Sequence, residues 1–338
     1  MTTEAKIQLT STELGRLWMT YQIKTAMLEI FKQFRESTID AEAKDILNSS
    51  VIQDQNIISE IVKIFKSQDA VIPKGFDDRD IFKDAPPLYD DIFNIMFLRQ
   101  IMKMNLAFSS LYLVTSYMKE VQDLFVLNHN VSKKFYVLTT EFLLKKGVLV
   151  KPPYVTIPNK VEFIEEKKYV NALNMTAGKR ALNTVEIGYI FEFIDDNILG
   201  MQLKTGFAQV AHESDVNIFF IEAKELSKKI ITNLTNLFLQ SDIQPPSTWA
   251  GKATISTQPP FSDKLMMFVV DLITNFAVGN NSLGTSFSMR SDLPLVFVEI
   301  TKDLLSNSKK GGELMIRHMW MEEPPQMEDR NQLTKSKN

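Results

Sequence analysis

Acidic residues in the second half of the chain have the type and spacing to bind a metal ion. Glu192 lies three residues before Asp195 and four before Asp196, and Glu222 lies three residues before Glu225. These spacings place both members of a pair on one face of a helix. Carboxylate oxygens are the ligands that hard cations prefer. The candidate ligands of an oxygen-only metal site are therefore Glu192, Asp195, Glu222 and Glu225.

A dinuclear iron site in a four-helix bundle also requires a Glu-x-x-His motif on two of its helices. The chain has three histidines, and the residues three positions before them are Val126, Gln209 and Met315, none of which is acidic. With no cysteine in the chain, thiolates cannot replace the missing imidazole ligands. The alternative interpretation places the carboxylates on the solvated edges of amphipathic helices, because burying an unpaired carboxylate is costly. We therefore expect no bound metal and no cofactor.

A second polar pair, Asp271 and Asn275, lies four residues apart inside an otherwise apolar segment. These two side chains are candidates to line a polar pocket that binds a small ligand of unknown identity. The alternative is that they form hydrogen bonds across a bundle of helices. We favour the alternative, because buried polar groups usually find hydrogen-bond partners.

Composition and motifs argue against several functional classes. The 38 Lys and Arg residues are balanced by 41 Asp and Glu residues, without the concentrated basic face that nucleic-acid binding needs. No apolar run approaches the ~20 residues of a membrane span, and the first residues lack the apolar core of a signal peptide. The chain has no Gly-rich phosphate loop and no His-Glu-x-x-His motif. We expect a cytoplasmic protein that is not an enzyme, with no nucleic-acid partner.

The sequence repeats itself after 172 or 173 residues. Residues 9–15 are echoed by residues 182–188, and Glu186 follows Glu13 by 173 positions. Both segments predict a helix start, with Thr10 or Asn183 as the N-cap and the glutamate three residues later completing a capping box. Pro-Pro pairs repeat at similar distances, at 86–87 and 259–260 and again at 152–153 and 324–325. The matched positions indicate a tandem duplication.

Proline positions divide each copy into four helices, because proline ends helices. The predicted helices span residues 11–36, 40–67, 88–118, 121–147, 184–212, 214–240, 262–290 and 292–321. A long connection separates the second and third helices of each copy, at 68–87 and 240–260, which permits the crossover of a ferritin-like bundle. The third helices are apolar nearly all round, so we expect them at the centre and at the contact between the halves.

The expected fold is therefore all-α, a tandem duplication of a ferritin-like four-helix bundle with a long crossover between helices two and three. We place the first bundle at residues 1–153, the linker at 154–181, the second bundle at 182–326 and a polar tail at 327–338. The linker contains apolar residues such as Phe163 and Ile164. We therefore expect the linker to pack partly against the bundles.

Several segments also resemble a known family. Residues 259–268 read Pro-Pro-Phe-Ser-Asp-Lys-Leu-Met-Met-Phe, and residues 320–326 read Trp-Met-Glu-Glu-Pro-Pro-Gln. With the paired helix starts, Trp18 and the Lys-Pro-Pro-Tyr motif at 151–154, the chain resembles domain-of-unknown-function family 3231, found chiefly in spore-forming bacilli. The resemblance covers about residues 8–330. It implies two ferritin-like bundles in one chain, and some members carry spore-coat-like descriptions, but it implies no activity.

Two functional hypotheses follow. The first is a non-enzymatic structural or interaction protein of spore-forming bacilli, cytoplasmic or deposited on the spore, which binds a protein partner or self-associates. The alternative is a ferritin-like protein that binds a metal or another ligand at an atypical carboxylate-rich site.

Overall fold

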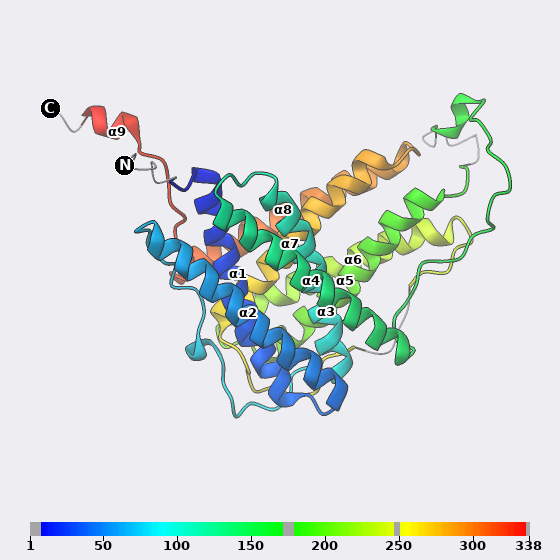
Figure 1. Ribbon diagram of the computed structural model, residues 1–338. Coiled ribbons are helices and arrows are strands. Elements are labelled where there is room, and N and C mark those ends of the chain that lie inside the picture. The colour runs from blue at the N-terminus through cyan, green and yellow to red at the C-terminus, as the bar shows by residue number, and fades with distance from the viewer. Residues whose placement is uncertain (1–7, 172–178, 247–250, 336–338) are drawn as a thin grey trace.

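The computed structural model describes residues 8–171, 179–246 and 251–335 (Figure 1). Within these ranges the chain forms helices and no β-strand, which confirms the predicted all-α class. The first half contains α1 (Ser11–Ser37), α2 (Ala41–Ser67), α3 (Asp91–Leu113) and α4 (Lys119–Lys145). The second half contains α5 (Thr184–Val210), α6 (Ser214–Leu239), α7 (Asp263–Phe287) and α8 (Asp292–Arg317).

The predicted helix starts are confirmed at α1 and α5. Thr10 caps α1 and Asn183 caps α5, and in each case the glutamate three residues on completes a capping box. Each glutamate also reaches across the bundle. The amides of Tyr117 and Met118, at the start of α4, donate to Glu13 at 2.7 Å. One side chain therefore satisfies the free amides of two helix ends.

Two helices end at least four residues earlier than predicted. The third helix was expected to reach residue 118, but α3 ends at Leu113, because the amides of residues 117 and 118 are bound by Glu13 and belong to the start of α4. The last helix was expected to reach residue 321, but α8 ends at Arg317. There Met319 has a φ of 56° and the Trp320 amide donates to the Met315 carbonyl at 2.8 Å. This bond closes the helix end in the manner of a Schellman motif.

Both halves pack their helices in the same order. In the first half, α1 packs on α2, α3 on α4, and α2 on α4; in the second half α5 packs on α6, α7 on α8, and α6 on α8. The halves touch through α3 with α5 and through α1 with α7. The prediction that the apolar third helices lie at the contact between the halves is therefore confirmed.

The two long connections, which follow α2 and α6, pair with each other. The Phe82 amide donates to the Pro260 carbonyl and the Thr254 amide donates to the Leu88 carbonyl, each at 2.9 Å. Residues 254 and 260 follow residues 82 and 88 by 172 positions. The two hydrogen bonds therefore join equivalent residues of the two halves, with the halves exchanged. Two isolated antiparallel bridges obey the same relation and join Ile81 to Phe261 and Tyr89 to Ala253. The halves therefore meet as in a two-fold symmetric dimer, each presenting the same surface to the other.

The buried core crosses this junction. Tyr89 stacks on Phe93 at 4.0 Å, and its hydroxyl donates to the Leu203 carbonyl of α5 at 2.6 Å. A Cβ added at Gly206 would lie 2.5 Å from that hydroxyl, so glycine allows the close approach. Phe34 of α1 contacts Phe261 edge-on at 6.2 Å. One large cluster of buried apolar residues thus includes the first half and the adjoining part of the second half, and a smaller cluster fills the remainder of the second half.

The linker runs as an extended segment beside the helices (Figure 1). Its described part contains one short 3-10 helix, η2 (Lys167–Tyr169), and residues 172–178 lie outside the described residues. The expectation of a partly packed linker was wrong for Phe163 and Ile164, which are 87% and 54% exposed. It holds for the end of the linker, where Arg180 stacks on the Tyr169 ring and the Ser291 amide, at the start of α8, donates to the Val170 carbonyl at 2.9 Å. The predicted tail contains a short exposed helix, α9 (Arg330–Lys335).

Among the described residues, no helix is both long enough and apolar enough to cross a membrane.

Candidate functional site

Two of the predicted metal ligands lie at the junction between the halves. On α5, Glu192 binds the ammonium group of Lys103, on α3, at 3.1 Å. Asp196, one turn further on, binds the same group at 2.5 Å and is 5% exposed at its side chain. Asp195 lines a small cavity of about 40 Å³ together with Arg99 and other residues, most of them on α3 and α5. At this junction Lys103 therefore forms ion pairs with both Glu192 and Asp196.

Burial and the neighbouring charges set the ionisation of the junction. Burial raises the pKa of Asp196 to about 6, and Lys103 offsets only part of that effect. Burial also raises the pKa of Asp195, against the attraction of Lys103 and Arg99. Burial alone would lower the pKa of Lys103, but the two carboxylates outweigh burial and raise it. The lysine therefore stays charged while Asp196 titrates near neutral pH.

The other two predicted ligands lie elsewhere, on the outer face of α6. Glu222 accepts from Lys310 of α8 at 2.9 Å, and Glu225 pairs with Lys228 at 2.8 Å. Both carboxylates are about half exposed. Among the described residues, no group of three or more His, Cys, Asp or Glu side chains could hold a metal ion. The structure therefore does not bring the four predicted ligands into one site.

The predicted polar pair on α7 is occupied by bonds within the protein. The Asn275 amide donates to Asp271 at 2.9 Å, and the Ser308 hydroxyl of α8 lies 2.9 Å from both Asp271 Oδ1 and Asn275 Oδ1. Burial raises the pKa of Asp271, and the bonds from Ser308 and Asn275 partly offset this. The pair joins α7 to α8, in the manner of the interpretation favoured from the sequence.

A buried ion pair that the sequence analysis missed lies in the middle of the first half. Lys24 of α1 donates to Asp54 of α2 at 2.6 Å, and the two side chains are 0% and 1% exposed. Burial raises the pKa of Asp54 even beside the ammonium group. Each residue is the fourteenth of a 27-residue helix, so both lie at the midpoint of the bundle. Lys24 lies on the apolar face of α1. A lysine at an apolar position was the sequence signal that could have revealed this buried ion pair.

The second half also has a buried lysine, at a different position. The residues equivalent to Lys24 and Asp54 are Asn197 and Ser227, and Lys204 donates to the Ser227 hydroxyl at 2.8 Å. Gly200 adjoins this amine, and a Cβ there would lie 3.6 Å from Lys204 Nζ, in ordinary van der Waals contact. Among the described residues, Lys204 has no ion pair, and burial lowers its pKa to about 8. Each bundle therefore places an amine from its first helix against its second helix.

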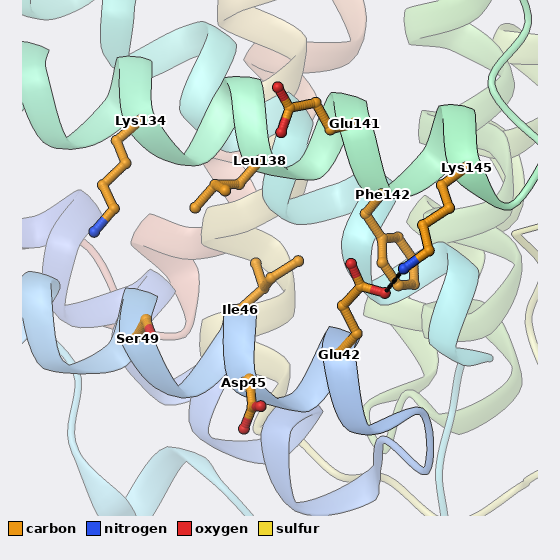
Figure 2. A pocket seen from close by; sticks show the side chains of 9 residues that line it. All are labelled: Glu42, Asp45, Ile46, Ser49, Lys134, Leu138, Glu141, Phe142 and Lys145. Carbon is orange, nitrogen blue, oxygen red and sulfur yellow. Dashed lines mark hydrogen bonds and ion pairs between the residues drawn. The ribbon is translucent and has the colours of Figure 1, made fainter.

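The outer face of the first half has an open groove of about 620 Å³ between α2 and α4 (Figure 2). Ile46 and Leu138 point into it from the two helices, and the ion pair of Glu42 with Lys145, at 2.7 Å, closes one end (Figure 2). A second groove of about 460 Å³ follows along the same two helices. The surface is thus a mixture of apolar and charged side chains.

The corresponding face of the second half is joined by ion pairs. They link α6 to α8 through Glu222 with Lys310 at 2.9 Å, Lys229 with Asp303 at 2.7 Å, and Asp215 with Arg317 at 3.3 Å. In the first half, Ser49 and Leu138 hold the positions equivalent to Glu222 and Lys310. The groove of Figure 2 therefore lies where the second half has a cross-helix ion pair.

Comparison with known proteins identifies the family. The crystal structure of a protein described as a "putative spore coat protein" from Bacillus halodurans C-125 aligns with a TM-score of 0.42 and 17% identity. The alignment covers 44% of this chain and 98% of that one. No curated protein matches the chain significantly. The family model described as "Protein of unknown function (DUF3231)" matches residues 1–161 and again residues 170–333, so the chain belongs to this family and carries two copies of its unit.

Proposed function

We propose that this protein is a structural or interaction protein with no catalytic turnover of its own, built from two fused ferritin-like bundles. The observation that carries the proposal is that each bundle interior contains an ammonium group of its own, at Lys24 and at Lys204. The long connections between α2 and α3 and between α6 and α7 support the ferritin-like arrangement.

Metal-binding bundles of this type place carboxylates from all four helices in the interior. In the first half, the interior carboxylate at the midpoint is Asp54, and Lys24 already binds it at 2.6 Å. A metal ion at Asp54 would lie within a few ångströms of a buried positive charge, where the repulsion is only weakly screened. The ion pair therefore disfavours a metal at this position.

The interior of the second half is even less suited to a cation. The residue equivalent to Asp54 is Ser227, and the amine of Lys204 lies 2.8 Å from it. A hydroxyl beside an amine offers neither the negative charge nor the ligand set that a hard metal ion needs. The carboxylates of this half face Lys103, Lys228 and Lys310 instead.

The outer surfaces offer room for a partner. Standard protein interfaces bury about 800 Å² per partner, which a pair of helices this long can present. The groove between α2 and α4 is one such surface (Figure 2). We propose contacts through bundle surfaces, either with a protein partner or by self-association. The division into bundles at 1–153 and 182–326, with a linker at 154–181 and a tail at 327–338, is part of this proposal, as are the cytoplasmic location and deposition on the spore.

The test uses the full-length chain with Glu192, Glu222 and Glu225 all changed to Gln. Metal content, molecular mass in solution and cellular phenotype are compared with those of the unmodified protein. A matched control changes Glu299, Glu313 and Glu328 to Gln, three exposed glutamates that line neither groove between α2 and α4. We expect neither variant to change metal content or assembly.

The alternative of a carboxylate-rich metal site makes the opposite prediction. If the first triple variant folds and assembles normally but loses bound metal and the phenotype, while the control keeps both, the structural role is wrong.

A further inference from the structure

Seven buried polar atoms in the described part of the first half have no hydrogen-bond partner, and four of them lie in the middle of α2 and α4. These four are Ser50 Oγ and Asp54 Oδ2 on α2, and Asn128 Oδ1 and Ser132 Oγ on α4. All four residues are at most 3% exposed. A buried polar atom without a partner costs free energy, so native proteins usually satisfy such atoms with protein groups or ordered water.

The register of the helices places Asp54 and Ser132 at the same level of the bundle, with Ser50 and Asn128 one turn away on opposite sides of that level. Lys145 of α4 pairs with Glu42 of α2, which fixes how the two antiparallel helices align. Counting inward from this pair, Asp54 of α2 lies level with residues 132 and 133 of α4. Ser50 precedes Asp54 by one turn, and each helix thus presents two polar side chains four residues apart on one face.

The second half provides a natural comparison at the same positions. Ser50, Asn128 and Ser132 correspond to Ala223, Ile300 and Leu304, all of which are buried. Asp54 corresponds to Ser227, whose hydroxyl accepts from Lys204. These four unpartnered atoms of the first half are therefore replaced in the second half by apolar groups or by a satisfied hydroxyl.

We propose that the centre of the first bundle binds ordered water molecules, one of which bridges Asp54 Oδ2 and Ser132 Oγ, while others bind the neighbouring Ser50 Oγ and Asn128 Oδ1. A carboxylate oxygen and an amide oxygen are acceptors, so the bound species must donate hydrogen bonds. Water donates two and also accepts from a hydroxyl, and buried waters typically make about three such bonds. The carboxylate repels an anion, and Lys24 at 2.6 Å from Asp54 repels a metal ion. This site goes beyond the proposed structural role, because it distinguishes a hydrated first bundle from a dry second one.

The test is NMR detection of long-lived water in the full-length protein, by magnetisation transfer from water to assigned methyl groups. Val51 and Val131 adjoin the polar residues of the first half, and Ile300 and Leu304 report on the equivalent level of the second half. We expect transfer to the valine methyls and none to the methyls of Ile300 and Leu304. Absence of transfer to the valines, or equal transfer in both halves, overturns the proposal.

A paired variant tests which atoms hold the water. Asn128→Ile with Ser132→Leu installs the residues of the second half, and we expect it to abolish transfer to Val51 while the protein stays folded. Ser50→Ala, which removes one hydroxyl and fills no space, serves if the double variant does not fold. We expect it to reduce the transfer at least twofold.

A crystal structure of the full-length chain grown with thallium(I) checks the identity of the ligand. Thallium(I) is detected by its anomalous scattering and replaces potassium. Water density without an anomalous peak supports the proposal. An anomalous peak between Asp54 and Ser132 means that the site binds a cation, which overturns both this proposal and the argument for a metal-free interior. A dry pocket overturns this proposal alone.

Discussion

The centres of the two halves each contain a buried lysine, and they stabilise its amine in different ways. In the first half Lys24 meets Asp54, so a buried positive charge has a buried negative partner at 2.6 Å. In the second half the buried Lys204 donates to the hydroxyl of Ser227 at 2.8 Å, without a carboxylate partner among the described residues. The first amine is compensated by charge. The second is stabilised by weaker hydrogen bonding, and burial shifts its pKa downward.

The scaffold around these centres is the same in both halves. Glu13 accepts from the amides of Tyr117 and Met118, and Glu186 accepts from the amides 172 residues later, at 3.2 and 2.9 Å. Asp91 binds the amides that start α2, and Asp263 binds those that start α6. Helix ends must satisfy their amides in any sequence of this fold, whereas the middle layer is free to vary if each buried polar group keeps a hydrogen-bond partner. The duplication therefore kept its caps and changed its interior.

The largest loss of stability is expected from removing one partner of the ion pair between Lys24 and Asp54. Asp54→Ala leaves Lys24 as an unpaired buried charge, which should lower the free energy of unfolding by about 3–5 kcal/mol. Ser227→Ala in the second half removes one neutral partner and should cost only about 1–2 kcal/mol. Denaturant unfolding measures both. Equal losses would contradict the comparison, and the double variant Lys24→Met with Asp54→Leu should recover most of the stability.

The shared caps should respond alike. Glu13→Ala and Glu186→Ala each remove a capping box and the bonds to a second helix start, at a cost of about 2 kcal/mol each. Burial opposes ionisation of both glutamates, but the amide bonds outweigh it, and at Glu186 also Arg180, so both pKa values lie below the ordinary value of 4.5. Their contribution is complete above pH 4.5 and is lost as the pH falls through the native pKa values. In both variants the free energy of unfolding should therefore decrease less with falling pH than it does in the unmodified protein, which acid unfolding measures.

The uncompensated lysine predicts a pH effect confined to the second half. Because burial lowers the pKa of Lys204 to about 8, the native state releases its proton before the unfolded state does. Stability should rise between about pH 8 and the unfolded pKa near 10.4, on the order of 1–3 kcal/mol. Lys204→Met should lack this rise when both proteins are unfolded at pH 7 and pH 9.5. A rise that persists in the variant would assign the effect to another group.

The smallest effect is expected on the outer faces. Glu222→Gln removes the ion pair with Lys310, both about half exposed, and should cost under about 0.5 kcal/mol. The measured loss tests the comparison of the α6/α8 face with the α2/α4 face. The first half has Ser49 and Leu138 at the equivalent positions, and these two residues cannot form an ion pair. A loss above about 1 kcal/mol would mean that the ion pairs, rather than the apolar contacts, hold α6 to α8.

The sequence by itself determined the helices and the duplication. Capping boxes act over three residues and prolines act at their own position, so Thr10, Glu13 and Asn183 could be interpreted without a partner. The apolar third helices also predicted their own place at the contact between the halves. These signals are local, or depend only on periodicity, and the chain carries them in every conformation.

The tertiary structure decided which buried groups meet. Lys24 and Asp54 are 30 residues apart, and Lys103 and Asp196 are 93 apart, so spacing along one helix could not pair them. The candidate metal ligands Glu192 and Glu222 lie on different faces, because the rotation of each helix is set by its neighbours. Phe163 is exposed for a similar reason, since an apolar side chain is buried only where another surface covers it. The positions of charges relative to one another follow from packing, and packing is a property of the folded chain.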